Sequence, residues 1–594
     1  MTALTTPPVI TNPPERDVQV AAIATDTMVL RSRSWNRLRF EMEYALERGT
    51  TANSYLIQGD RIAVIDPPGE SFTEKYLVAL EALVSLQAID YIILGHINPN
   101  RAATLKALLK QAPQATIVCS NPAAKILQSL YDETMQADLP DYELKLLIQK
   151  GEDVLDLGQR HQLQFSLTPT PRWPGGLCTY DQATKILYTD KFYAAHICGE
   201  ALFDEGWSEF LEDQRYYFDS VMASQAKQVG IALEKLTTYD ALVYAPAHGP
   251  VLRYGRRGLE AAYQQWSQKQ IQQTLKVALL YASAYGSTGT IARAIAQGIS
   301  KAGVQVEMLN CEVATTDELR SALEQCNGFV IGSPTLGGHA PTPIQTALGI
   351  VISTVPKNRS AGVFGSFGWS GEAIDLLKNK LTDAGYKLGF APIRVKFKPT
   401  DTTLKTCEEA GTDFAQALKR AKKKADRKAA PSLLQSQSAG MEQAVGRILG
   451  SLCVLTAKKG DVQSAMVASW VSQATFNPPG LTVAVAKDRA VESLTHTGDR
   501  FVLNILSEAN YLPIQKHFLK PFKPGADRFD GIETQASDAG APILASALAY
   551  LECKVQNRME CGDHWVVYAI VDQGKVLDEE SKTAVHYRKT GRFY

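Results

Sequence analysis

One loop of this sequence places a histidine where α/β proteins often bind metals. The segment GHINPNR, Gly95 to Arg101, follows an apolar run, YIIL, and precedes a helical pattern, AATLKALLK. A strand that ends in a polar loop and leads into a helix is a common place for a site, and imidazole is a common metal ligand. From position alone, the loop is a metal site, the remnant of one, or an ordinary connection.

A second loop has the residues of a phosphate cradle. The segment YASAYGSTGT, Tyr281 to Thr290, sets hydroxyls between the end of an apolar strand and the start of a helical pattern. Hydroxyls and free backbone N–H groups at a helix N-terminus bind phosphate, assisted by the helix dipole. The absence of a Walker lysine and of GxGxxG disfavours nucleoside triphosphates and Rossmann-type dinucleotides. Ordinary turn chemistry is the alternative. The predicted cradle residues are Ser283, Tyr285, Gly286, Ser287 and Thr288.

Two later loops favour the phosphate interpretation. Both follow apolar strands, so the three loops are expected to gather at one edge of a parallel sheet. They carry small residues and an aromatic, Trp369, suited to flanking a flat ring. Together the three loops resemble the FMN loops of flavodoxins, and the resemblance implies a bound FMN. The further residues predicted to bind it are Ser333, Pro334, Thr335, Leu336, Gly337, Gly338, Ser366, Phe367, Gly368, Trp369, Ser370 and Gly371.

Composition excludes several classes of function. Hydrophobic residues make up 45% and charged residues 21% of the chain, as in an ordinary globular protein. The 62 basic and 62 acidic residues balance, so no net charge favours nucleic acid or an anionic membrane. No apolar run approaches the roughly 18 residues of a membrane span. The N-terminus lacks the apolar core of a signal peptide, and the nine cysteines contain no CxxC pair, which predicts a reducing, cytoplasmic setting.

Changes of character along the 594 residues predict a multidomain protein of α/β and α+β classes. Residues 1–30 are expected to be flexible. β-rich runs alternate with helical stretches over 31–270, and strand-loop-helix units over 271–420 predict a doubly wound sheet. A basic run and a Pro/Ser/Gln stretch indicate a linker at 421–440. Over 441–594, a KKGD hairpin signal and an NPPG turn are typical of a β-barrel domain.

Three separated segments of the last domain resemble the flavin reductase family. They are AMVASWVSQATFNPPGLTVAVAKD, NRMECGDHWVVYAIV and the terminal HYRKTGRFY. The resemblance implies a split β-barrel that binds FMN or FAD and reduces it with NADH or NADPH. It also implies that Asp563 and His564 lie near the edge of the nicotinamide or isoalloxazine. The residues it assigns to the flavin are Ser464, Ala465, Met466, Ser469, Trp470 and Ser472.

The order of the three domains carries a wider resemblance. The first domain looks like the metallo-β-lactamase fold, an αββα architecture. Followed by flavodoxin-like and flavin-reductase-like domains, it resembles the flavodiiron proteins, or A-type flavoproteins. More narrowly, it is similar to the three-domain diflavin type of cyanobacteria and other photosynthetic organisms. This implies that electrons pass from NAD(P)H through two flavins to a diiron site that reduces O2 to water.

The resemblance also implies seven metal-ligand positions. The family has a HxExDH loop, a His before a Trp-Pro turn, a bridging Asp, and a His in an HG turn. Imidazoles there supply neutral donors, while carboxylates neutralise and bridge two irons. In this sequence the retained positions are His96, Asp190 and His248, and the replaced positions are Asn98, Asn100, Arg101 and Arg172.

These replacements predict that the chain holds no ordinary diiron centre. Two anionic ligands have become amides, and two imidazoles have become guanidiniums, which cannot deprotonate to coordinate a metal. A guanidinium about 5 Å from a dication, at an effective dielectric of about 20, costs ~6–7 kcal/mol, or roughly four to five orders of magnitude in affinity. The cavity would more readily hold water or a small anion such as chloride or sulfate. One weak metal on the three retained ligands is the alternative.

Three functions remain open. The first is a diflavin oxidoreductase subunit in photoprotective electron transport, which feeds an intact flavodiiron paralogue. In the family, subunits pair head to tail, so the FMN of one chain faces the metal site of the other in a heterodimer or homodimer. The second is a regulatory or structural partner of that paralogue. The third is a stand-alone NAD(P)H:flavin or acceptor reductase. The sequence assigns no catalytic residue and leaves the physiological donor and the partner open.

Overall fold

The computed structural model describes residues 16–35, 48–139, 143–151, 153–429 and 434–588, with side chains omitted over 425–439. The chain divides into two compact units, 1–271 and 272–594. No helix in the described part of the chain combines the length and apolarity needed to cross a membrane.

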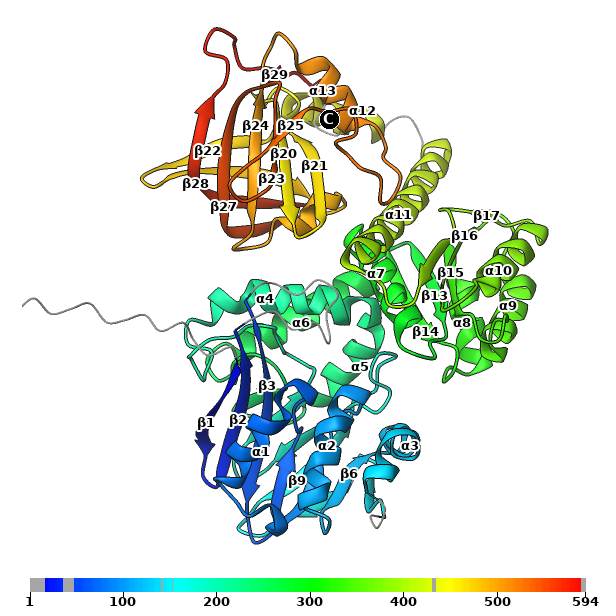
Figure 1. Ribbon diagram of the computed structural model, residues 1–594. Helices are drawn as coiled ribbons and strands as arrows, with labels where there is room; N and C mark the ends of the chain where they lie inside the picture. The colour runs from blue at the N-terminus through cyan, green and yellow to red at the C-terminus, as the bar shows by residue number, and fades with distance from the viewer. Residues whose placement is uncertain (1–15, 36–47, 140–142, 152, 430–433, 589–594) are drawn as a thin grey trace, which may run out of the picture. The chain divides into compact units, whose positions relative to one another are not determined.

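The first unit is built on two sheets (Figure 1). The first sheet has seven strands in sequence order: β1 (Arg16–Ala24), β2 (Thr27–Ser34), β3 (Thr50–Gln58), β4 (Ile62–Ile65), β5 (Ile89–Ile93), β6 (Thr116–Ser120) and β7 (Leu146–Gln149). The second has the order β12-β11-β10-β9-β8, with β8 (Val154–Asp156), β9 (Gln162–Leu167), β10 (Leu177–Asp181), β11 (Ile186–Asp190) and β12 (Val243–Pro246).

Side-chain alternation in the strands produces four layers. In β3, Tyr55 and Ile57 point into the core between the two sheets, whereas Leu56 packs with helices on the outer face. That outer face is covered by α1 (Thr73–Glu81), α2 (Pro99–Gln111) and α3 (Asn121–Leu130). The outer face of the second sheet is covered by α4 (Leu211–Tyr217), α5 (Ala226–Leu236) and α6 (Arg256–Ile271). The architecture is αββα, in agreement with the sequence prediction.

The N-terminal boundary predicted from the sequence is wrong. Residues 1–30 were expected to be flexible, but β1 begins at Arg16 and pairs antiparallel with β2. Val29 and Leu30 in β2 are fully buried, one on each face of the sheet. The apolar alternation of VQVAAIA and MVL drives this pairing because it places side chains in the core. Residues 1–15 lie outside the described part.

The second unit contains a parallel, doubly wound sheet. Its order is β14-β13-β15-β16-β17, with β18 also paired to β16. The strands are β13 (Lys276–Tyr281), β14 (Gln305–Asn310), β15 (Gly328–Pro334), β16 (Ser360–Phe367), β17 (Lys387–Leu388) and β18 (Ile393–Lys396). One face packs on α8 (Thr316–Gln325), α9 (Thr342–Thr354) and α10 (Glu372–Asp383). Elsewhere in this module, α7 (Ser287–Lys301) packs closely against α11 (Asp401–Ala429).

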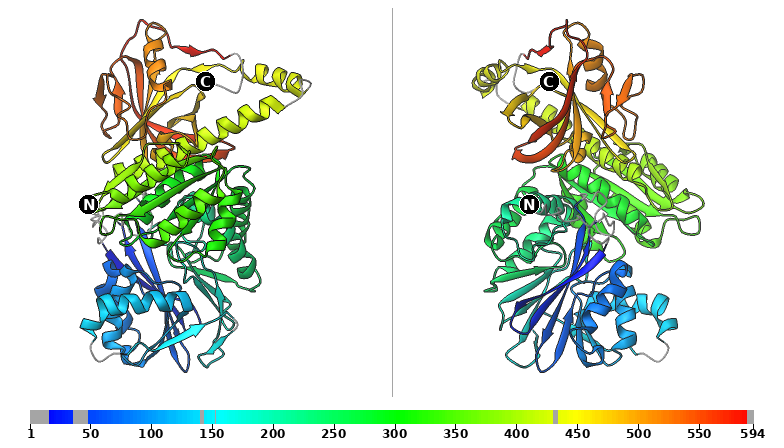
Figure 2. Two further views of the ribbon diagram at one scale, coloured as in Figure 1. Left: turned by 90° about the vertical axis from the view of Figure 1, so that its right-hand side faces the viewer. Right: turned by 60° about the vertical axis from the view of Figure 1, so that its left-hand side comes forward.

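The remainder of the second unit is an antiparallel sheet in the order β21-β20-β24-β27-β28-β23-β22. Its strands are β20 (Cys453–Lys459), β21 (Val462–Ala468), β22 (Val471–Phe476), β23 (Pro479–Ala486), β24 (Arg500–Leu506), β27 (Ala547–Cys561) and β28 (His564–Val576). The sheet curves around one apolar core (Figure 2), and in the described part of the chain its two end strands, β21 and β22, are not paired with each other, as in a split barrel. Accessory elements are β19 (Gly450–Ser451), β25 (Thr534–Ala536), β26 (Pro542–Leu544), β29 (Val585–His586), α13 (Tyr511–Leu519) and the 3-10 helix η8 (Ala490–Leu494).

The predicted linker at 421–440 is largely helical. Helix α11 continues to Ala429, and α12 (Leu434–Val445) begins within the same range. Alanine, lysine and arginine are strong helix formers, so the basic run extends the preceding helix instead of ending it. Residues 430–433 lie outside the described part.

Candidate metal and flavin sites

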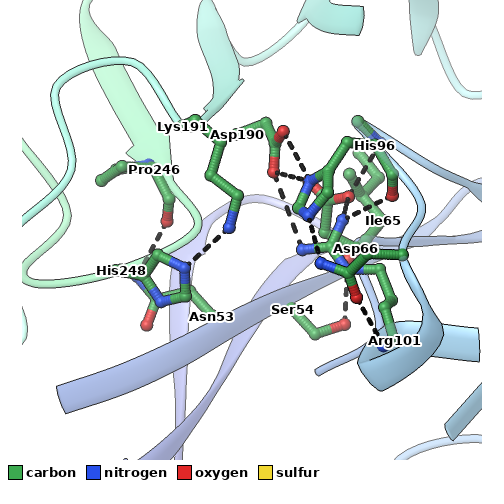
Figure 3. Close-up of polar contacts among 12 residues, drawn as sticks. Asn53, Ser54, Ile65, Asp66, His96, Arg101, Asp190, Lys191, Pro246 and His248 are labelled. Carbon is green, nitrogen blue, oxygen red and sulfur yellow. Dashed lines mark hydrogen bonds and ion pairs between the residues drawn. The ribbon is translucent and has the colours of Figure 1, made fainter. Parts of the chain in front are cut away.

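His96 and Asp190, two of the three retained ligand positions, contact each other. His96 follows β5 and Asp190 ends β11, so each side chain stands at a strand end. The Nδ1 atom of His96 lies 2.8 Å from Oδ2 and 3.0 Å from Oδ1 of Asp190 (Figure 3). Both residues are buried. The carboxylate therefore already holds the imidazole, so two of the retained positions engage each other.

The Arg101 guanidinium sits in the same cluster. Its Nη1 atom donates to Oδ1 of Asp66 at 2.6 Å and to the carbonyl oxygen of His96 at 3.1 Å (Figure 3). Its Nη2 atom lies 3.7 Å from Asp190 Oδ1. One fixed cation thus faces two buried carboxylates. In such a pocket a dication would meet a guanidinium instead of a donor lone pair.

Asp66 is a member of this cluster that the sequence reasoning missed. It follows β4 in AVIDPP, is 3% exposed, and also accepts from the backbone N–H of Gly95 at 2.8 Å. Burial raises the pKa of the Asp66 carboxyl, and the adjacent Arg101 charge opposes that rise. An aspartate directly after an apolar strand, before two prolines, was the available signal.

His248, the third retained position, is engaged by a lysine. Lys191 Nζ lies 2.8 Å from His248 Nε2 (Figure 3), and His248 Nδ1 faces the carbonyl oxygen of Thr51. A protonated lysine donates to a neutral imidazole nitrogen, which uses the lone pair that a metal would need. Lys191 was also missed, although it directly follows Asp190 in LYTDKF.

The two asparagines have structural contacts in place of ligand roles. Asn98 caps α2 by accepting from the Arg101 backbone N–H at 2.9 Å, and its Nδ2 lies 3.3 Å from His96 Nε2. Asn100 accepts from the backbone N–H of Glu70 at 3.1 Å. The Asn100 side chain also fills the space beside Gly69, where an added Cβ would come within 2.2 Å of Nδ2. The amides therefore stabilise the loop.

Arg172 lies beside the cluster in the TPRWPG turn. Its guanidinium carbon is 5.3 Å from the centroid of the Trp173 ring, and Lys191 Nζ is 5.8 Å from the same ring. Trp173 in turn packs edge-on to His96 at 6.2 Å. Two cations thus flank one aromatic ring at the edge of the former ligand set.

The space left between these side chains is small. The cavity lined by His96, Asn98, Arg101, Lys191 and His248 has a volume of about 20 Å³, room for about one or two water molecules. Within the described residues, no group of three or more His, Cys, Asp or Glu side chains is placed to hold a metal ion. The donors present do not fit a diiron centre, because His96 and Asp190 contact each other, Lys191 engages His248, and the Arg101 guanidinium lies against Asp66 and Asp190.

The predicted phosphate and ring residues meet at one sheet edge in the second unit. Tyr281 pairs with Gly332, and Pro334 pairs with Ser366, so β13, β15 and β16 end side by side. The Thr288 and Ser366 hydroxyls, from two of the loops, are 2.7 Å apart. Gly286 has φ of 80° at the N-cap of α7, a conformation that favours glycine.

This edge has two features of an FMN cradle. The buried Thr335 hydroxyl has no hydrogen-bond partner among the described residues, so it can serve a ligand. Tyr285 and Trp369 are 91% and 92% exposed, an unusual state for large aromatics that are free to flank a ring. Ser333 is buried with its hydroxyl on the Pro334 carbonyl, which makes it a loop-stabilising residue here. The assignment of individual contacts to FMN stays a prediction.

The residues predicted for the second flavin differ in their surroundings. Trp470 and His564 pack together with ring centroids 4.9 Å apart, and the Arg588 guanidinium lies 5.1 Å from the Trp470 ring. Ala465 and Met466 instead line a cavity of about 520 Å³. Ser464 has a buried hydroxyl that makes no hydrogen bond within the described part. Ser472 donates to the backbone carbonyl of Gln473.

Two residues near this site were missed. Ser469 Oγ lies 3.1 Å from Nδ1 of His586, which belongs to β29, and Arg588 follows two residues later. Burial, followed by the Arg588 charge, lowers the pKa of His586. Both residues lie in the terminal HYRK segment, whose resemblance to flavin reductases was the available signal.

Comparisons with known proteins match this order of modules. Family descriptions match residues 50–249 (ODP family beta lactamase), 279–411 (flavodoxin) and 445–593 (flavin reductase like domain). Diflavin flavoprotein A 6 of Nostoc sp. is 62% identical over 98% of this chain and 99% of its own length. Diflavin flavoprotein A 3 of Synechocystis sp. is 60% identical over 98% of this chain and 96% of its own. The metal-soaked Flv1 flavodiiron core from Synechocystis sp. is 58% identical, covers 69% of this chain and 100% of its own, and superposes with a TM-score of 0.67.

A metallo-β-lactamase-like unit, a flavodoxin-like module and a flavin-reductase-like module together define a multidomain flavoprotein. The identities over nearly the full length then settle its relationship. The chain belongs to the diflavin flavoprotein A family of flavodiiron proteins.

Proposed function

We propose that this chain is an NAD(P)H-oxidising electron-transfer subunit that reduces O2 to water only together with an intact flavodiiron paralogue. The observation that carries the proposal is the contrast between its two kinds of site. The FMN cradle keeps a buried hydroxyl and two exposed aromatics available. The former metal pocket is filled by Arg101 and Lys191.

The residues present determine which step each chain of the pair carries out. The hydroxyls of Ser283, Thr288 and Thr335 and the first turn of α7 would hold the FMN phosphate and ribityl chain, and Trp369 would flank the ring. When bound, flavins accept an electron pair from NAD(P)H and release electrons singly or in pairs. Because the described residues of the first unit offer no donor set for a diiron centre, the O2-reducing centre belongs to the partner, in a head-to-tail heterodimer.

We also propose that the former metal pocket holds water or a small anion. Its volume supports an occupant no larger than this. The positive charge that lines it comes from Arg101 and Lys191, whereas Arg172 is not among the lining residues. A cytoplasmic location is proposed as well, supported by nine free cysteines, since free thiols are typical of reducing compartments.

Co-expression with a flavodiiron paralogue that carries all seven ligands tests the function. The heterodimer is expected to contain two flavins per chain, iron only in the paralogue, and NAD(P)H-dependent O2 uptake well above that of this chain alone. Loss of uptake on replacing Thr288 or Trp369 in this chain supports electron transfer. Unchanged uptake would instead indicate a regulatory or structural partner, and full turnover by the isolated chain with an artificial acceptor would indicate a stand-alone reductase.

A further inference from the structure

A large cavity in the second unit lies between its two modules. Its volume is about 520 Å³, within the range of nucleotide and cofactor sites. One wall is helix α11 of the flavodoxin module. The others are β21, the start of η8 and the segment following α13, all from the reductase module. Ala465 and Met466, assigned to the second flavin from the sequence, are on one of these walls.

The cavity is rich in cations. Five lysine or arginine residues and three carboxylates line it. Two carboxylates are already engaged: Glu409 accepts from Arg528 at 3.2 Å and from the Gly525 N–H at 3.0 Å, and Asp488 accepts from Gln416 at 2.9 Å. The third, Asp413, is half-buried and lies in the field of the surrounding arginines.

Two of the arginines that line the cavity are not ion-paired with a carboxylate in the described part of the chain. Within the described residues, neither Arg420 on α11 nor Arg489 after β23 has a carboxylate within ion-pair distance. By contrast, Arg528 is tied to Glu409 and lies 5.1 Å from the Phe522 ring. One guanidinium from each module lines the same cavity, and arginine is a side chain that can bind phosphate in bidentate fashion.

We propose that this cavity binds the phosphate-bearing part of a nucleotide cofactor, with Arg420 and Arg489 as its phosphate ligands. The proposal rests on the proposed function, which requires a second nucleotide cofactor in the reductase module. Its new element is Arg420: a residue of the flavodoxin module completes the cofactor site of the reductase module. Apolar contact comes from Ala465, Met466 and Phe522. The phosphate belongs either to the flavin or to NAD(P)H, whose phosphate chemistry is shared.

The test uses the full-length chain and the variants R420A, R420K and R489A. Lys424→Ala is the matched control, because Lys424 is an exposed cation on the same helix that does not line the cavity. Flavin content per chain is measured by absorbance after denaturation. FMN, FAD, NADH and NADPH are each titrated by calorimetry into chain depleted of flavin. Binding of FMN by the flavodoxin module, compared between each variant and wild type, shows whether the variant is folded.

R420A and R489A are each expected to weaken binding of one nucleotide class by about 10-fold or more, the scale of one charge-assisted hydrogen bond. R420K should recover only part of the affinity because it cannot bind in bidentate fashion. Weakening of FMN or FAD assigns the phosphate to the flavin, whereas weakening of NADH or NADPH alone assigns it to the donor. If the wild-type chain holds two flavins and R420A binds every nucleotide within 2-fold of wild type, this inference is overturned and the proposed function stands. If the wild-type chain holds one flavin and NAD(P)H does not reduce it, both are overturned.

Discussion

Lys191 Nζ lies 2.8 Å from His248 Nε2, so a retained metal ligand is bound to a cation that the protein itself supplies. Arg101 has the equivalent relationship to the carboxylates of Asp66 and Asp190. Positive charge in the pocket is therefore provided by side chains. The loss of metal ligands is more complete than counting replaced positions suggests, because the retained ligands have acquired new partners.

Restoring the four replaced ligand positions is expected to be insufficient for tight iron binding. The variant carrying N98E, N100D, R101H and R172H should bind Fe(II) about 10-fold or more weakly than the same variant with Lys191→Met added, because the ammonium repels a dication and holds His248. Anaerobic Fe(II) titration with metal analysis measures both. If the variants with and without Lys191→Met bind two irons with equal affinity, the contact between Lys191 and His248 does not weaken iron binding.

Removing Arg101 is expected to destabilise the first unit. R101A leaves Asp66 buried without its cation, which should cost ~3–5 kcal/mol of unfolding free energy, whereas R101M combined with D66N should recover most of it. Arg61→Ala is the control, since Arg61 is an exposed arginine near the same sheet. Urea denaturation followed by hydrogen-exchange mass spectrometry reports this unit separately. A loss no larger than that of R61A would contradict the role assigned to the Arg101–Asp66 pair.

FMN affinity should depend on the Thr288 hydroxyl. T288V removes one donor from the loop and leaves Ser366 without its contact at 2.7 Å. The expected result is about 10-fold weaker FMN binding, equivalent to ~1.4 kcal/mol, in a fluorescence titration. Thr382→Val makes the same chemical change on α10, where the hydroxyl donates to the Lys378 carbonyl, and should leave FMN affinity unchanged. If T288V binds FMN with wild-type affinity, the Thr288 hydroxyl does not contribute to FMN binding.

Because of Asp213, the free energy of unfolding of the first unit should fall as the pH rises from 4 to 7. Burial raises the pKa of Asp213 to about 7, although Arg48 lies 2.5 Å away. The unfolded chain releases this proton near pH 4, so between about pH 4 and 7 the folded state holds the extra proton. The stability contributed by the protonated group is therefore complete below about pH 4 and declines by at most ~1.4 kcal/mol per pH unit up to about 7. D213N should flatten this slope relative to wild type in urea denaturation at pH 5 and 7; identical slopes would contradict the assignment.

Local chemistry in the sequence was sufficient to predict the three modules. Hydrophobic alternation and strand-loop-helix order identify elements because they depend on neighbouring residues. The three flavin loops were found in the same way, since parallel strands bring their carboxyl ends to one edge. The errors arose at boundaries. The composition near the N-terminus indicated flexibility, but pairing with β2 makes residues 16–24 a strand, β1. The composition after residue 420 indicated a linker, but its helix propensity extends α11.

The sequence by itself determined that Asn98, Asn100, Arg101 and Arg172 cannot supply the ligands of a diiron centre, because amides lack the negative charge of carboxylates and guanidiniums have no lone pair to donate. Only the tertiary structure decided what the retained residues do instead. Asp66 is 35 residues from Arg101 and Lys191 is 57 residues from His248, so no local pattern reveals these pairs. They form because two sheets bring four strand ends together, and because a buried polar or charged side chain is destabilising unless it finds a hydrogen-bonding or charged partner.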